Sequence, residues 1–227
     1  MSSSTDWLRR SLDLWWSQSD RDHPGNDAGV EANRRLTAVS GSVLVLLLTL
    51  VVLSGLVFGW SPALHYFLGF AAIPLTLLKL ASTGWRFLGY YVVRSRRYRS
   101  AGPPSPLPRL LAPVVVASGV AAFVTGVVLF FQGTDRGTVA SLHTDSAVVF
   151  ILAVLLHAAI HLRTTWRVTI DDVHPTGGGT ATLALRGVTT RRALVVGACV
   201  AGLVLAVALV GGYHWTLVRH HVPFREG

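Results

Sequence analysis

The sequence predicts an all-α integral membrane bundle of about five transmembrane helices. Of its 227 residues, 51% are hydrophobic and only 14% are charged, which leaves too little polar surface to cover a water-soluble domain of this size. The apolar residues come in blocks of roughly 20, the length that a helix needs to cross a bilayer. Residues 43–57 are almost continuously apolar, whereas a barrel strand would alternate polar and apolar side chains.

The positions of the spans follow from the apolar blocks and the short polar stretches between them. Arginine-rich segments precede the first span and connect the second to the third and the fourth to the fifth. By the positive-inside rule, we expect a multi-pass protein of the cytoplasmic membrane with its N-terminus inside and its C-terminus outside. Since the arginines lie beside spans, the net charge of +9 marks topology and indicates no nucleic-acid partner. The predicted spans cover about residues 37–59, 63–84, 111–132, 142–162 and 193–213.

This pattern divides the chain into four parts. Residues 1–35 form a cytoplasmic segment that is either an interfacial helix or an exposed tail. Residues 36–163 form a four-helix membrane core, and residues 164–192 form a cytoplasmic loop. Residues 193–227 hold the fifth helix and an outer tail, and we expect this helix to pack against the outside of the core.

Ionisable residues inside the spans are the first functional candidates, because a charge in hydrocarbon is costly. Fourteen residues separate His65 from Lys79, and fourteen separate His143 from His157. A step of this length returns to within about 40° of the same helix face and descends about 21 Å. Spans two and four therefore each present two polar side chains on one face, at two membrane depths.

Glycines recur at the same spacing in the other two core helices. Gly41 and Gly55 lie in span one, and Gly119 and Gly133 lie in or next to span three. A glycine lets a flat ligand approach the backbone closely, while imidazoles from the intervening helices can reach an iron from either side. Alternatively, these glycines only pack helices together. The coincidence of four equal spacings favours haem binding.

The order glycine, histidine, glycine, histidine over residues 36–163 resembles the four-helix core of the b-type membrane cytochromes, such as cytochrome b561 and the cytochrome subunits of hydrogenases and formate dehydrogenases. Residues 78–87 and 90–91, followed by Ala-Gly-Pro-Pro at 101–104, are similar to uncharacterised actinobacterial members of this superfamily. The resemblance implies one or two haem b groups stacked across the bilayer. It assigns the outer iron to His65 and His143.

The inner position departs from that pattern, because Lys79 stands where a second histidine is expected. His157 with Lys79 would hold an inner haem, since a neutral lysine can ligate iron. Lys79 could instead extend to the headgroups. His161 follows His143 by 18 residues, or five helical turns, and is a substitute ligand on the same face.

We expect a b-type haem protein that carries electrons within or across the membrane, and not a self-contained enzyme. No nucleotide or flavin motif is found, so the partners expected are membrane lipid, a quinone and a separate redox protein, and a homo-oligomer stays open. One alternative is a haem-free membrane anchor or scaffold. Another is a small transporter with Lys79, His157 and His161 as an ion relay.

Overall fold

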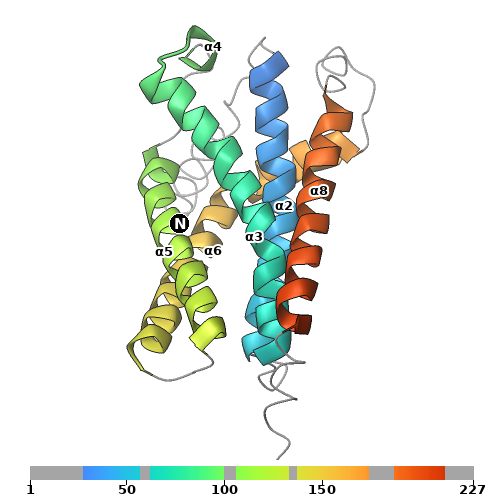
Figure 1. The fold of residues 1–227 in the computed structure, drawn as a ribbon. Coiled ribbons are helices and arrows are strands. Elements are labelled where there is room, and N and C mark those ends of the chain that lie inside the picture. The colour runs from blue at the N-terminus through green and yellow to red at the C-terminus, as the bar shows by residue number, and fades with distance from the viewer. Residues whose placement is uncertain (1–27, 57–61, 100–105, 133–136, 174–186, 213–227) are drawn as a thin grey trace, which may run out of the picture.

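A computed structural model describes residues 28–56, 62–99, 106–132, 137–173 and 187–212 (Figure 1). Within these ranges every regular element is helical, and five helices are long and apolar enough to cross a membrane. The predicted all-α membrane bundle is thereby confirmed. The five helices are α2 (Ala28–Leu56), α3 (Pro62–Phe87), α5 (Pro106–Gln132), α6 (Thr138–Val173) and α8 (Val188–Ala206).

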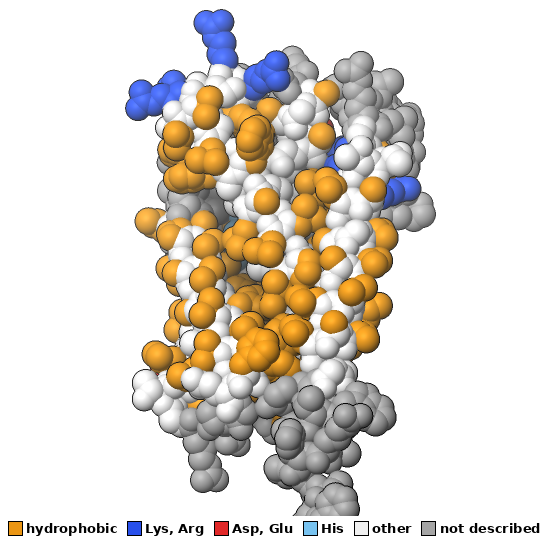
Figure 2. Space-filling view, viewed as in Figure 1, with side chains coloured by type: hydrophobic (Ala, Val, Ile, Leu, Met, Phe, Trp, Pro, Cys, Tyr) orange, Lys and Arg blue, Asp and Glu red, His pale blue; other side chains and the backbone are white. Residues whose placement is uncertain are grey.

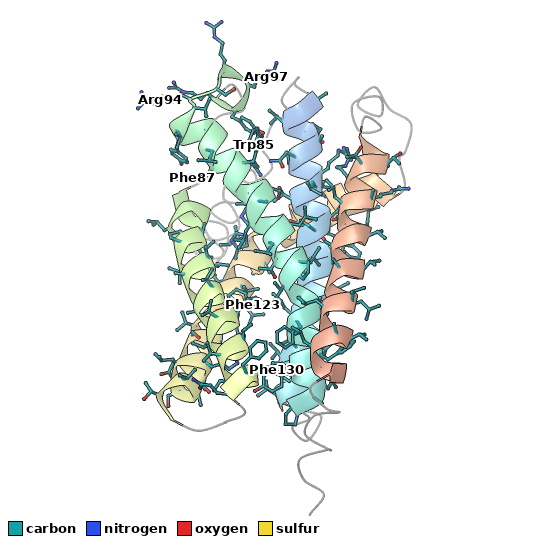
Figure 3. All side chains as sticks on the ribbon, viewed as in Figure 1. Trp85, Phe87, Arg94, Arg97, Phe123 and Phe130 are labelled. Carbon is teal, nitrogen blue, oxygen red and sulfur yellow. The ribbon has the colours of Figure 1, made fainter. Side chains whose placement is uncertain are left out.

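Three short elements complete the described fold. The π-helical segments η1 (Leu88–Val92) and η2 (Val207–Gly211) extend α3 and α8, and α4 (Arg96–Arg99) follows η1. Arg94 has a φ of 49° at the turn into α4, where the chain leaves the helical direction of α3. Figure 3 places Arg94 and Arg97 at one extreme end of the bundle.

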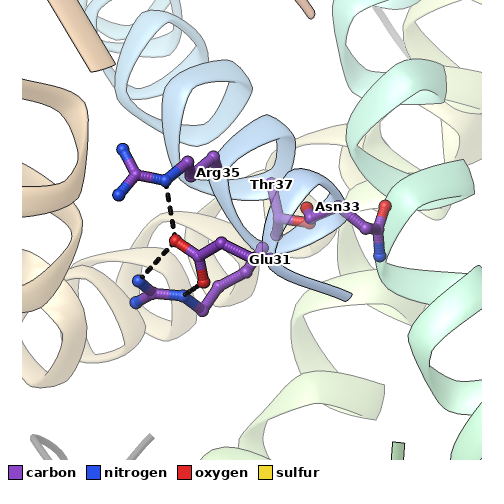
Figure 4. A network of polar contacts seen from close by, with 5 residues as sticks. Glu31, Asn33, Arg35 and Thr37 are labelled. Carbon is purple, nitrogen blue, oxygen red and sulfur yellow. Dashed lines mark hydrogen bonds and ion pairs between the residues drawn. The ribbon is translucent and has the colours of Figure 1, made fainter. Parts of the chain in front are cut away.

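Two helices are longer than the spans predicted from the sequence. The α2 helix begins at Ala28, inside the segment predicted to precede the membrane. Glu31 accepts hydrogen bonds from Arg34 at 2.8 Å and from Arg35 at 2.7 Å, and these one-turn ion pairs stabilise the added turns (Figure 4). The α6 helix continues to Val173, so the first part of the predicted 164–192 loop is helical.

The bundle consists of two antiparallel hairpins and one further helix (Figure 1). The α2 helix pairs with α3, α5 pairs with α6, and contacts of α3 with α5 and of α2 with α6 close the four helices into a ring. The α8 helix contacts α3 and α2. The backbones of α8 and α3 approach closely at Gly202, because a Cβ at this position would meet the carbonyl oxygen of Ala71 in α3.

Aromatic residues join three helices near one end of the bundle. Phe70 of α3 and Phe130 of α5 are almost fully buried and pack edge to face, with centroids 4.8 Å apart. Ala206 of α8 belongs to the same cluster, and Tyr66 packs against Phe130 at 5.1 Å (Figure 3). This cluster packs α3, α5 and α8 together at the end of the bundle where α3 begins.

The outside of the bundle is apolar along most of its length. Figure 2 shows hydrophobic side chains over the middle and Lys or Arg side chains gathered toward one end. Leu46 and Leu77 are 69% and 60% exposed, and Val204 is 61% exposed. Such a continuous apolar exterior fits a hydrocarbon surrounding, and it agrees with five membrane-spanning helices.

Candidate functional site

Two histidines face each other at the end of the bundle opposite α4. His65 lies near the beginning of α3 and His143 near the beginning of α6, and both are half-buried. Their ring centroids are 6.3 Å apart, and the ring planes make an angle of 88°. The fold therefore brings together the two histidines that the sequence predicts as the outer pair.

The ring of His65 is held by the helix that precedes it. Its Nδ1 atom lies 3.1 Å from the carbonyl oxygen of Val51 and 3.2 Å from Oγ of Ser54, both in α2. Ser54 is completely buried, and its hydroxyl donates to the same Val51 carbonyl at 2.7 Å. The α2–α3 hairpin thus fixes the orientation of this imidazole.

The ring of His143 is held in the same manner by α5. Its Nδ1 atom lies 2.9 Å from the carbonyl oxygen of Ala122 and 3.2 Å from Oγ1 of Thr125. A Cβ on Gly126 would come within 3.0 Å of Cε1 of this ring, which is tighter than an ordinary contact. Glycine at position 126 therefore provides the space that the imidazole occupies.

These hydrogen bonds decide the tautomer of both rings. A carbonyl oxygen can only accept, so each Nδ1 carries a proton, and in the neutral form of the ring Nε2 carries the lone pair. An Nδ1–H that donates to a carbonyl is the usual outer-shell contact of a metal-bound histidine, because it orients the ring and makes the ligand more basic. Nε2 is thus the atom of each histidine that could bind a metal ion.

The separation of the rings matches one metal ion between two imidazoles. If both Nε2 atoms point at one metal ion along a common line, with a metal–nitrogen bond of about 2 Å and about 1.1 Å from Nε2 to the ring centroid, the centroids would lie about 6.2 Å apart. The distance between His65 and His143 is 6.3 Å. No group of three or more His, Cys, Asp or Glu in the described ranges could hold a metal ion. A haem iron requires only two axial protein ligands, because the porphyrin supplies the rest.

The inner position is built differently. Lys79 of α3 donates from Nζ to the carbonyl oxygen of Thr37 in α2 at 2.5 Å. A Cβ on Gly41 would lie 2.7 Å from this Nζ, so Gly41 makes room for the lysine side chain. Lys79 belongs to a polar seam between α2 and α3, in which Thr37 contacts Ser82 at 2.9 Å and Asn33 donates to the Ser82 carbonyl at 3.0 Å.

His157 and His161 lie one turn apart on α6, with ring centroids 4.7 Å apart and planes at 53°. Nδ1 of His157 is buried and has no hydrogen-bond partner among the residues that the structure describes. The carbonyl contact that fixes His65 and His143 is thus not repeated at His157.

The predicted glycines divide into different environments. A Cβ on Gly119 would meet the ring of Phe150 at 2.8 Å, so this glycine accommodates a phenyl group of α6. Gly41 accommodates Lys79, as described above. Gly55 is half-buried and directly follows Ser54, whereas Gly133 lies outside the described residues.

Sequence reasoning missed the groups that hold the two outer rings: Ser54, Thr125 and Gly126. Their signal is a repeated dipeptide of a hydroxyl residue and glycine, Ser54-Gly55 near the end of α2 and Thr125-Gly126 in the second half of α5. Each dipeptide precedes a Leu-His pair in the first turns of the next helix of the hairpin. The spacing to the histidine differs, since Ser54 precedes His65 by 11 residues and Thr125 precedes His143 by 18.

Comparisons with protein-family models, curated proteins and solved structures gave no match to this chain.

Proposed function

We propose that this protein binds one haem b between His65 and His143 and carries electrons at that position in the cytoplasmic membrane. The observation that carries the proposal is the adjacent pair of imidazoles, with ring centroids 6.3 Å apart and each Nδ1 on a backbone carbonyl. When bound, the haem supplies reversible one-electron chemistry at its iron. The chain supplies the two axial nitrogens and their orientation.

The surroundings of the pair support this function. The ring of Tyr66 lies 6.4 Å from that of His65 between centroids and 5.1 Å from that of Phe130, so the site adjoins the aromatic cluster. His65 and His143 lie near the beginnings of their helices, and so close to one membrane surface. An electron can then pass between a membrane-soluble donor such as a quinone and a separate redox protein at that surface. The positive-inside rule makes it the outer surface.

The inner position gives weaker support for a second haem. Lys79 is already engaged with the Thr37 carbonyl and lies against Gly41. Among the described residues, Nδ1 of His157 has no partner comparable to the carbonyl acceptors of the outer histidines. We therefore propose a single haem. A measured ratio of two haems per chain would instead establish a second haem, with His157 and either Lys79 or His161 as its ligands.

The test is a reduced-minus-oxidised visible spectrum of the full chain, purified in detergent from haem-replete cells, with haem quantified as the pyridine haemochrome. The proposal predicts a b-type spectrum and one haem per chain. A folded, monodisperse preparation without a Soret band would overturn it and favour a haem-free membrane anchor.

A further inference from the structure

The two hairpins hold their histidines with the same set of atoms. In α2 the acceptors for His65 are the carbonyl of Val51 and the hydroxyl of Ser54, three residues later. In α5 the acceptors for His143 are the carbonyl of Ala122 and the hydroxyl of Thr125, again three residues later. Both hydroxyl residues are followed by glycine. The same arrangement has thus arisen on both sides of the site.

The hydroxyl groups accept from the imidazoles, because their own protons are directed elsewhere. Ser54 donates from Oγ to the Val51 carbonyl at 2.7 Å, and Thr125 donates from Oγ1 to the Ala121 carbonyl at 2.6 Å. A lone pair of each hydroxyl therefore remains for the Nδ1–H at 3.2 Å. Each Nδ1–H is shared between two acceptors.

Sharing between two acceptors has a geometric consequence. A single carbonyl lets an imidazole turn about the N–H···O direction, whereas two acceptors at different positions restrict that turn. The restriction applies independently on α2 and on α5, and the two ring planes stand at 88°. Each hydroxyl oxygen is a second acceptor for the Nδ1–H group. This makes the imidazole more basic and so a stronger ligand.

We propose that Ser54 and Thr125 are positioning residues that hold the two axial imidazole planes perpendicular and keep the haem potential low. This inference rests on the proposed haem at His65 and His143. The two residues act through the histidines and do not touch the iron themselves.

Other hydroxyl residues of the bundle provide matched controls. Thr49 of α2 donates to the Val45 carbonyl at 2.8 Å, and Thr144 of α6 donates to the Ala140 carbonyl at 3.1 Å. Both side chains are exposed, and neither contact involves an imidazole. Thr49→Ala and Thr144→Ala therefore remove a helix-bound hydroxyl without changing the atoms around Nδ1.

The experiment compares the ferric EPR spectrum and the midpoint potential of the full-length protein with those of Ser54→Ala and Thr125→Val. Perpendicular axial planes leave two iron d orbitals nearly equal in energy, which produces a strongly anisotropic low-spin signal. We expect this signal in the wild type. In both variants we expect a shift toward a rhombic signal with a smaller maximum g value, together with a more positive potential.

The conservative variants Ser54→Thr and Thr125→Ser keep a hydroxyl in place and should restore both readouts. Loss of haem from Ser54→Ala or Thr125→Val, with haem retained in the conservative variants, also supports the proposal. An unchanged signal and potential in both variants would overturn it, and so would equal changes in Thr49→Ala and Thr144→Ala. A wild-type protein without haem would overturn the proposed function as well, and this result appears before any variant is made.

Discussion

The rings of His65 and His143 stand at 88° to each other with their centroids 6.3 Å apart, although 78 residues separate them in the chain. Two antiparallel helix pairs bring them together, and each pair uses its first helix to hold the histidine of its second. The site is therefore assembled by packing between the hairpins, and its stability depends on small residues at close contacts.

Gly126→Val is expected to displace the ring of His143. A Cβ at this position already lies 3.0 Å from Cε1 of the imidazole, and the two methyl groups of valine extend the contact further. The haem content of the purified protein should fall by more than half, as measured by the pyridine haemochrome. Gly69→Val is the control, because a Cβ at Gly69 meets nothing within 4 Å. Equal haem content in the two variants would contradict this reading of Gly126.

Gly202→Ala is expected to separate α8 from α3, because the added methyl meets the backbone carbonyl of Ala71. Overpacking of this kind costs about 1–3 kcal/mol, which lowers the Tm of a protein of this size by several degrees. The contacts that hold the rings of His65 and His143 come from α2 and α5, so the haem spectrum should stay the same. Thermal unfolding in detergent measures the effect, with Gly211→Ala as the open-space control. An unchanged Tm would show that the α3–α8 contact is looser than described.

Lys79→Met is expected to leave the haem count unchanged. Its Nζ donates to the Thr37 carbonyl, so the lysine acts as a link between α2 and α3, and loss of that bond should cost about 1–3 kcal/mol. The haem-to-protein ratio and the Tm are measured on the same preparation. Two haems in the wild type and one in Lys79→Met would establish Lys79 as an iron ligand.

Glu31→Gln is expected to destabilise the beginning of α2. Glu31 is 4% exposed and accepts from both Arg34 and Arg35, and the amide of glutamine cannot compensate their charges. A loss of about 2 kcal/mol should lower the Tm by roughly 4–8 °C. Asp145→Asn, which changes an exposed carboxylate, should have a much smaller effect. Similar Tm values for both variants would indicate that the Glu31 pairs add nothing measurable.

The number of spans was predictable from the sequence, because it depends on helix length and hydropathy. The proximity of His65 and His143 was expected because both stand at the outer ends of their spans and match the resemblance to the four-helix cytochrome core. The role of Lys79 was not, since its bond to Thr37 depends on how closely α2 approaches α3 at Gly41. The contacts of Ser54 and Thr125 also depend on packing between helices. Their Ser-Gly and Thr-Gly dipeptides stand at different distances from the histidines, 11 residues before His65 and 18 before His143, so an alignment of the two hairpins does not bring them together.

The central claim is that His65 and His143 hold one haem, and the most direct measurement is the haem content of His65→Ala and His143→Ala beside that of His157→Ala. Each protein is purified in detergent, checked for monodispersity, and quantified by its reduced-minus-oxidised spectrum and pyridine haemochrome. We expect the b-type signal to be lost in both outer variants and retained at one haem per chain in His157→Ala. Full haem content in either outer variant, or loss of the signal in His157→Ala alone, would contradict the claim.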